Sequence, residues 1–145
     1  MSPRPPRPFR IEVRVRYGDT DAAGVVYYAN YLRYFEAARV DALRELGLPI
    51  REAESRGVLL PAVSARCEYR RPAFVDDLLW VDMWLDHRGR GSFGFSYEVL
   101  RDDELIATGS TRHAVVDRET LRPLRLDGWL AELLERAEER QTAGQ

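Results

Sequence analysis

The first regular pattern in the chain is an alternation of apolar and polar residues. From position 9 to position 17 every second residue is apolar, and the residues between are arginine or glutamate. Such alternation places the two sets of side chains on opposite faces of a β-strand. We therefore predict a strand over residues 9–17, with a buried face made of Phe9, Ile11, Val13, Val15 and Tyr17.

The next pattern is helical and spans residues 27–46. Apolar side chains recur there at spacings of three and four, and further apolar residues widen the stripe beyond one face. A helix of this kind is mostly buried in its domain. Gly47 can take the left-handed conformation that ends a helix, and Pro49 follows it, so we expect the helix to stop at Leu46.

Four more strands are predicted over residues 63–70, 79–86, 93–99 and 104–117, and an amphipathic helix starts near Asp127. One strand, a long buried helix and four strands indicate an α+β domain in which a five-stranded antiparallel sheet curls around the helix. We expect this single domain to cover residues 9–138. The proline-rich residues 1–8 and the last residues, 139–145, are expected to form flexible tails.

Composition and charge narrow the class of protein. A chain of 145 residues fits one domain, and its formal net charge of −2 provides no field for binding nucleic acid. Cys67 is the only cysteine, so no disulfide can form within the chain. No apolar run reaches the ~18 residues of a membrane span, and no signal peptide is recognisable. We therefore expect a cytoplasmic protein without membrane insertion.

The segment "DTDAAG", residues 19–24, joins the first strand to the long helix and carries two carboxylates. One interpretation is an ordinary turn in which aspartates cap backbone amides. A calcium loop starting at Asp19 is excluded, because its twelfth position would be Asn30 where a bidentate glutamate is required. No histidine-rich cluster or Gly-Lys-Ser/Thr phosphate loop accompanies the carboxylates, so we predict no metal and no cofactor.

A chemical interpretation uses the apolar helix that follows the loop. A buried helix beginning near Val26 directs unpaired N–H groups and a partial positive charge at whatever precedes it. One such donor is worth roughly 2.7–4 kcal/mol to an oxyanion in acyl transfer, and a nearby carboxylate can act as base or nucleophile. A thiol, with a pKa near ~8.5, leaves without a general acid. A carboxylate with no positioned histidine therefore favours a thioester substrate.

The stretch "RYGDTDAAGVVYYANYLRYFEAAR" (16–39) resembles the signature of hotdog-fold acyl-CoA thioesterases, specifically the 4-hydroxybenzoyl-CoA thioesterase/YbgC-like group. The likeness continues in "YRRPAFVDDLLWV" (69–81) and "RHAVVDRETLRP" (112–123) and covers roughly residues 9–135. It implies a sheet wrapped around a central helix and hydrolysis of an acyl-CoA to free acid and CoA. It also implies that Asp21 is the catalytic carboxylate and that the Tyr28 backbone N–H polarises the thioester carbonyl.

The resemblance further implies where the substrate binds. Residues expected at the acyl pocket are Gly24, Val25, Tyr27, Asn30 and Tyr31. In the aromatic-substrate branch a basic hairpin meets the CoA phosphates, and "HRGRG" (87–91) occupies the equivalent place with Arg88 and Arg90. Plain solvation of these arginines is the alternative. Family members are homo-oligomers, either dimers or dimers of dimers, with each active site at a subunit interface.

Several alternatives remain open at this point. A non-catalytic module that binds acyl-CoA or acyl-carrier protein would keep the pocket without turnover, and a structural partner of an envelope complex is a further possibility. A hotdog hydratase needs a histidine with an acidic partner, whereas His87 and His113 are assigned structural roles. The YbgC-like branch typically has histidine where this chain has Tyr28, and the aromatic-substrate branch has tyrosine. The acyl group, the choice between CoA and acyl-carrier protein, and the role of Asp21 as nucleophile or general base therefore stay open.

Overall fold

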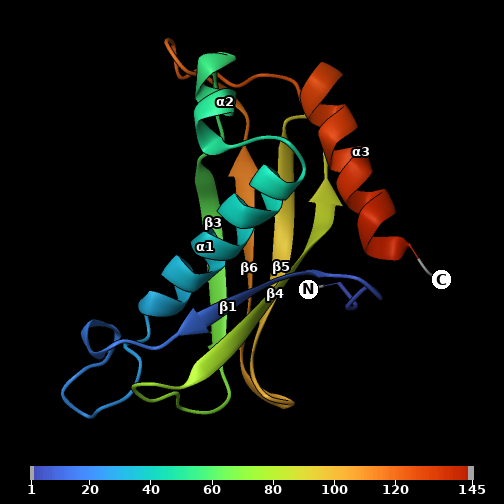
Figure 1. Cartoon of the computed structure of the whole chain (residues 1–145). Helices are drawn as coiled ribbons and strands as arrows, with labels where there is room; N and C mark the ends of the chain where they lie inside the picture. Colours follow the sequence, from blue (N-terminus) through green and yellow to red (C-terminus); the bar gives the residue numbers. More distant parts are fainter. Residues whose placement is uncertain (1, 144–145) are drawn as a thin grey trace.

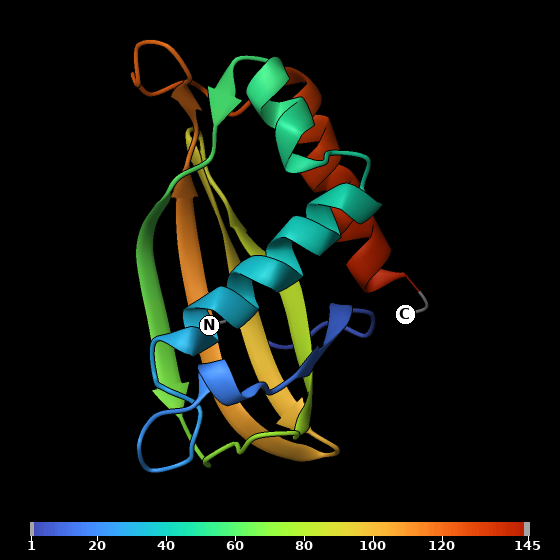
Figure 2. The same ribbon diagram turned by 60° about the vertical axis from the view of Figure 1, so that its left-hand side comes forward.

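A five-stranded antiparallel sheet is the framework of the computed structural model, which describes residues 2–143. Its strands lie in the order β1-β4-β5-β6-β3. Their bounds are β1 Phe9–Arg14, β3 Ala62–Tyr69, β4 Leu78–Arg88, β5 Ser92–Arg101 and β6 Glu104–Ala114. The long helix α1, Asn30–Glu45, crosses the concave face of this sheet (Figures 1 and 2). The predicted fold class, a sheet wrapped around a central helix, is confirmed.

Smaller elements complete the fold. They are a 3-10 turn at Tyr17–Asp19, α2 at Ile50–Ser55, a two-stranded sheet of β2 (Val58–Leu59) and β7 (Val116–Asp117), and α3 at Gly128–Thr142. Helix α3 packs beside β4 (Figure 1). We predicted one strand over 104–117, but the pairing with β5 ends at Ala114, because the Val115 N–H instead donates to the Gly91 carbonyl at 3.2 Å. None of the helices within residues 2–143 has the length and apolar character that crossing a membrane requires.

Phe35 makes a close contact between α1 and the sheet. This side chain is fully buried, and its ring stacks on that of Tyr97 with centroids 4.3 Å apart and planes 14° apart. The same ring lies over Gly109 of β6, where an added Cβ would come within 2.4 Å of it. A glycine at this position lets the helix approach the sheet. The stack therefore fixes the depth of α1, and with it the position of the helix N-terminus.

The ends of the first strand and of α1 differ partly from the sequence prediction. Strand β1 stops at Arg14, because the Val15 N–H donates to Asp77 at 2.9 Å, and Tyr17 is 84% exposed rather than buried. Helix α1 begins at Asn30, not at Tyr27. Its predicted end is confirmed: Gly47 has φ of +94°, and the following N–H reaches back to the Leu43 carbonyl at 2.8 Å, as in a Schellman motif.

The segment expected to be a flexible N-terminal tail makes specific contacts with the outer face of the sheet. The Trp84 indole donates to the Ser2 hydroxyl at 2.9 Å, and Arg4 of the same segment takes part in an ion-pair cluster around Asp82. Asp82 is fully buried and pairs with Arg4 at 2.5 Å and with Arg10 at 2.6 Å. A buried carboxylate left without these partners would be costly. The mobility of residues 2–8 stays a prediction.

The predicted C-terminal tail, 139–145, lies within α3 as far as Thr142, and residues 144–145 are outside the described part of the chain. The Gln141 side chain is buried and satisfies both backbone groups of Leu85, at 3.0 Å to its N–H and 2.8 Å to its carbonyl. This is where the pairing of β4 with β5 shifts register. The last turn of α3 thus supplies hydrogen bonds that the irregular strand lacks.

A buried histidine connects β6 to the segment before β3. His113 is 2% exposed, its Nδ1 lies 3.2 Å from the Leu60 carbonyl, and its Nε2 lies 2.9 Å from the Thr111 hydroxyl. Burial, with a smaller contribution from the positive charge of Arg39, lowers the pKa of His113 to about 4. The folded protein therefore holds this ring neutral.

We expect stability to fall as the pH falls from 6.5 towards 4. In this range an unfolded histidine, with a pKa near ~6.5, takes up a proton that folded His113 does not. The histidine contribution is complete above about pH 6.5, and about 3 kcal/mol is lost by pH 4. Urea unfolding of the wild type and of His113→Gln at pH 7, 5.5 and 4.5 tests this, since glutamine cannot titrate. The same pH slope in both proteins would contradict the expectation.

Candidate active site

The loop that carries Asp21 has a fixed backbone. Its ends are joined by the Asp21 N–H donating to the Val25 carbonyl at 2.9 Å, and Gly24 has φ of +83°, a conformation that suits glycine. The Val26 N–H donates to the Ala73 carbonyl at 2.9 Å, which ties the loop to the segment between β3 and β4. The Ala23 N–H donates to Asp21 Oδ1 at 2.8 Å. Within the described residues Asp21 Oδ2 has no hydrogen-bond partner, so one carboxylate oxygen is available for chemistry.

The other aspartate of the motif holds the loop together. Asp19 Oδ2 accepts a hydrogen bond from the Arg16 N–H at 2.9 Å and another from the Tyr34 hydroxyl at 3.1 Å. Its backbone carbonyl accepts from the Tyr27 N–H at 2.9 Å and from the Asn30 side-chain amide at 2.8 Å. These bonds hold residues 27–29 in a turn and delay the start of α1. The carboxylate and the carbonyl of Asp19 thus both serve to hold the loop.

The turn before α1 offers free backbone donors. The Asn30 N–H donates to the Tyr27 carbonyl at 2.9 Å, whereas the N–H groups of Tyr28 and Ala29 find no acceptor among residues 2–143. The Tyr69 hydroxyl, from the end of β3, donates to the Tyr28 carbonyl at 2.9 Å and restrains this turn. The partial positive charge of the helix N-terminus acts at the same place. The arrangement can stabilise a negative charge on an oxygen placed against the turn.

A cavity of about 380 Å³ brings the loop and the turn together. This volume is in the range of small-molecule sites, about 300–1,000 Å³. Its lining residues are Asp21, Val25, Val26, Tyr28, Tyr31, Tyr69, Arg70, Arg71 and Pro72. The Tyr31 and Tyr69 rings meet edge to face at 5.4 Å. Burial raises the pKa of both hydroxyls to about 12, so both rings are neutral near pH 7 and the wall that they form is largely apolar.

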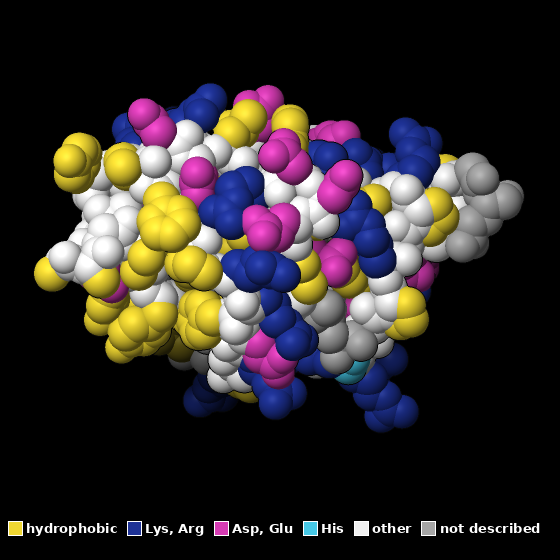
Figure 3. All heavy atoms as spheres, turned by 90° about the horizontal axis from the view of Figure 1, so that it is seen from below, with side chains coloured by type: hydrophobic (Ala, Val, Ile, Leu, Met, Phe, Trp, Pro, Cys, Tyr) yellow, Lys and Arg dark blue, Asp and Glu magenta, His cyan; other side chains and the backbone are white. Residues whose placement is uncertain are grey.

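The structure brings together only part of the site predicted from sequence. Asp21, Val25, Tyr28 and Tyr31 line one cavity. Gly24 shapes the loop without lining the cavity, as do Tyr27 and Asn30, which take part in the turn. Exposed apolar side chains gather at this end of the molecule, as Figure 3 shows from below. Those on the two loops there are Tyr17, Tyr27, Tyr28, Phe74 and Val75.

Two further predicted residues lie elsewhere. Arg88 is the last residue of β4 and Arg90 lies in the turn after it, at the end next to α3, where Arg88 Nε pairs with Glu138 at 2.8 Å. The other end of β4 follows the segment that is tied to the Asp21 loop through Ala73. The 11 residues of this strand span roughly 33 Å at about 3.3 Å per residue, so within one chain these arginines are remote from Asp21.

Five cavity residues were missed in the sequence prediction: Val26, Tyr69, Arg70, Arg71 and Pro72. For the last four the available signal was the stretch "YRRPAFVDDLLWV", which shares the family likeness but was assigned no role. Tyr69 is the last residue of β3, an edge strand that pairs with β6, and Arg70, Arg71 and Pro72 follow it.

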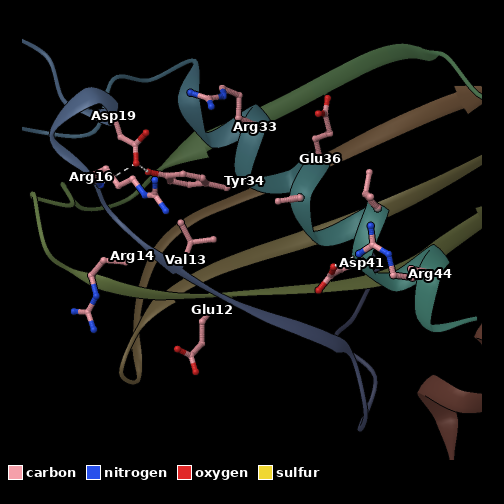
Figure 4. A pocket seen from close by; sticks show the side chains of 12 residues that line it. Glu12, Val13, Arg14, Arg16, Asp19, Arg33, Tyr34, Glu36, Asp41 and Arg44 are labelled. Carbon is pink, nitrogen blue, oxygen red and sulfur yellow. Dashed lines mark hydrogen bonds and ion pairs between the residues drawn. The ribbon is translucent and has the colours of Figure 1, made fainter. Parts of the chain in front are cut away.

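A larger cavity, of about 620 Å³, lies on the other side of the loop, between β1 and α1 (Figure 4). Asp19 and Tyr34 line it, and Asp21 does not. Its charged walls carry four arginines and four acidic residues: Arg14, Arg16, Arg33, Arg44, Glu12, Asp19, Glu36 and Asp41. Because it contains neither the free carboxylate nor the free backbone donors, the smaller cavity is the candidate active site.

The remaining chemistry-bearing groups support no other catalytic centre. Neither ring nitrogen of His113 contacts a carboxylate, and His87 Nε2 lies 3.2 Å from the Ser92 hydroxyl. The acidic partner that a hydratase histidine requires is therefore missing from the described part of the chain. In residues 2–143, no three histidine, cysteine, aspartate or glutamate side chains gather so that they could hold a metal ion.

Comparison with known proteins identifies the family of the chain. A family model described as the thioesterase-like superfamily matches residues 15–134. A putative esterase from Aquifex aeolicus is 39% identical over 109 residues, covering 75% of this chain and 85% of that protein. The acyl-CoA thioesterase YbgC of Haemophilus influenzae is 32% identical over 117 residues, covering 80% and 86% respectively. The crystal structure of a DHNA-CoA thioesterase from Staphylococcus aureus matches with a TM-score of 0.85 and 28% identity, covering 94% of each chain.

The fold and the similar proteins identify the chain as a thioester hydrolase with the hotdog fold. The chain belongs to the thioesterase-like superfamily, as its signature motif predicted. The roles of individual site residues stay predictions.

Proposed function

We propose that this protein hydrolyses acyl-CoA thioesters, with Asp21 as the reacting carboxylate and the Tyr28 N–H as an oxyanion donor. The observation that carries the proposal is their meeting in one cavity. The Asp21 carboxylate keeps one unpaired oxygen there, and the Tyr28 turn keeps free N–H groups at the start of a helix. Among relatives, YbgC is named an acyl-CoA thioesterase, which supports the same substrate class.

The reaction can follow either of two routes at this site. In one, an Asp21 oxygen attacks the thioester carbonyl and CoA leaves as a thiolate, after which water hydrolyses the mixed anhydride. In the other, Asp21 accepts a proton from a water molecule as that water attacks the carbonyl. Both routes place negative charge on the carbonyl oxygen, where an N–H of the Tyr28 turn can donate a hydrogen bond. Both consume one water molecule and give free acid and CoA.

Thiol release from a panel of acyl-CoAs tests the proposal. Acetyl-, palmitoyl- and benzoyl-CoA would each be incubated with the protein and a thiol-detecting reagent. We expect catalytic release of CoA from at least one of them, and the preferred chain will define the acyl pocket formed by Tyr28, Tyr31 and Tyr69. Absence of release from all three would contradict the proposed substrate class.

We also propose that the protein is a homo-oligomer assembled through the β3 edge. Strand β3 ends the sheet, and its Val63 and Tyr69 side chains are 63% and 49% exposed. Leu32 of the nearby helix is 39% exposed as well. An edge strand with exposed apolar side chains is a natural pairing surface. A native mass that is a multiple of the 16.7 kDa subunit is expected, and a monomer would refute the assembly.

A further inference from the structure

The turn before α1 is a β-turn whose central peptide joins Tyr28 to Ala29. The Asn30 N–H closes the turn by donating to the Tyr27 carbonyl at 2.9 Å. Both ends of the turn are tied to the Asp19 carbonyl, through the Tyr27 N–H at 2.9 Å and the Asn30 side-chain amide at 2.8 Å. None of these bonds reaches the central peptide, so another contact must set the orientation of that peptide.

The contact that reaches the central peptide comes from Tyr69. Its hydroxyl donates to the Tyr28 carbonyl at 2.9 Å, and no other donor among residues 2–143 is directed at this oxygen. The Ala29 N–H belongs to the same peptide and points away from the oxygen, because the peptide is planar and trans. Holding the oxygen therefore also fixes the direction of this N–H.

Tyr69 makes this contact from a rigid position. It is the last residue of β3, and the chain directly after it is fixed because the N–H groups of Arg70 and Arg71 both donate to the Ile106 carbonyl, at 2.8 and 3.1 Å. The Tyr31 ring meets the Tyr69 ring edge to face at 5.4 Å. A group held by a strand and by ring packing can orient a flexible turn precisely.

The same hydrogen bond changes the strength of a backbone donor. A hydrogen bond to a peptide oxygen polarises the peptide, so that its N–H becomes a stronger donor. The N–H affected here is that of Ala29, which finds no acceptor among residues 2–143, as is also true of the Tyr28 N–H. Burial raises the pKa of the Tyr69 hydroxyl to about 12, so this hydroxyl keeps its proton from pH 7 to pH 9.

An oxyanion site is effective when its donors are oriented before charge develops on the carbonyl oxygen. We propose, resting on the thioesterase function above, that Tyr69 is a positioning residue. Its hydroxyl orients and polarises the Tyr28–Ala29 peptide, so that the free N–H groups of the turn stabilise the oxyanion. The hydroxyl keeps its own proton throughout and transfers none to the leaving thiolate.

Thiol release by Tyr69→Phe, measured with the preferred acyl-CoA of the panel, tests the proposal. We expect kcat to fall about ten-fold, the effect of losing one hydrogen bond from the transition state. KM should stay within about two-fold, because the ring still lines the cavity. Melting temperature and native mass should match the wild type. The control Tyr17→Phe loses an exposed hydroxyl at the same end of the molecule and should keep the wild-type kcat.

A second measurement follows the turn without turnover. The probe is a ketone analogue of the acyl-CoA, in which CH2 replaces the thioester sulfur and the carbonyl carbon is ¹³C. Its infrared carbonyl stretch should fall on binding to the wild type, because the N–H groups of the turn polarise the carbonyl. The fall should be smaller in Tyr69→Phe and complete in Tyr17→Phe.

Two results would overturn this role for Tyr69. One is a wild-type kcat in Tyr69→Phe. The other is a lower kcat with the same infrared shift as the wild type, which would make Tyr69 a structural part of the cavity wall. If the wild type releases no thiol but the infrared shift still depends on Tyr69, the proposed function fails while the orientation of the turn by Tyr69 stands.

Discussion

Replacing Asp21 by asparagine is expected to lower kcat by about 10²- to 10⁴-fold, the range lost when a positioned base or nucleophile is removed. Asparagine has nearly the shape of aspartate, and its amide oxygen can still accept the Ala23 N–H that Asp21 Oδ1 accepts at 2.8 Å. The loop should therefore keep its conformation and the KM should change little. Thiol release and thermal unfolding of the same preparation provide the measurement.

A matched control removes a carboxylate that has no part in the proposed chemistry. Asp41 lies on α1 and pairs with Arg44 at 2.8 Å with both side chains exposed, so Asp41→Asn should keep kcat within about two-fold. If Asp21→Asn retains wild-type kcat, the assignment of this carboxylate is wrong, whatever reaction the protein catalyses.

Replacing Gly109 by alanine is expected to lower the free energy of unfolding by about 3 kcal/mol, at the upper end of ordinary overpacking. The new Cβ would lie 2.4 Å from the Phe35 ring and 2.6 Å from the Arg66 backbone oxygen. The ring is clamped against Tyr97, and the oxygen belongs to the neighbouring strand, so neither can yield cheaply. Urea unfolding at pH 7 measures the loss.

The control for this change is Gly18→Ala. An added Cβ at Gly18 has no heavy atom within 4 Å, and the backbone there is not in the left-handed region. Its effect should stay within about 0.5 kcal/mol. Equal stability of the two variants would show that α1 does not rest on β6 as closely as described.

The order of elements could be predicted because hydrophobic periodicity reports burial on one face. The stop signal at Gly47 acts locally and was interpreted correctly, and the alternation that begins at Phe9 predicted the start of β1 but not its end at Arg14. The start of α1 was predicted three residues too early, because it depends on hydrogen bonds from Tyr27 and Asn30 to the Asp19 carbonyl. Those bonds hold three residues in a turn that the apolar pattern alone would assign to the helix.

The site could be predicted as far as its residues lie in one continuous motif. Asp21 and Tyr28 are seven positions apart, and the resemblance covers both. Arg70 and Arg71 reach the same cavity only because the sheet places the end of β3 beside the loop, and no local pattern carries that information. The phosphate-binding role that the resemblance implies for "HRGRG" stays a prediction, and within one chain Arg88 pairs with carboxylates of α3.

Local sequence patterns also do not show what covers the outer face of the sheet. Residues 2–8 have the composition of a tail, yet Arg4 contacts Asp82, which is fully buried. The signal was indirect: a strand that carries an aspartate between two tryptophans, Trp80 and Trp84, needs a cationic partner if that face is covered. Only the tertiary structure shows that the cover comes from the chain's own N-terminal segment.

The decisive measurement is a count of CoA thiols released per subunit when acyl-CoA is in large excess. If Asp21 and the Tyr28 turn form a hydrolytic site, the wild type will release many thiols per subunit at a constant rate. A non-catalytic acyl-CoA binding module would instead take up its ligand, as calorimetry would record, and release no more than one thiol per subunit. That second result would contradict the assignment of this cavity as a thioesterase active site.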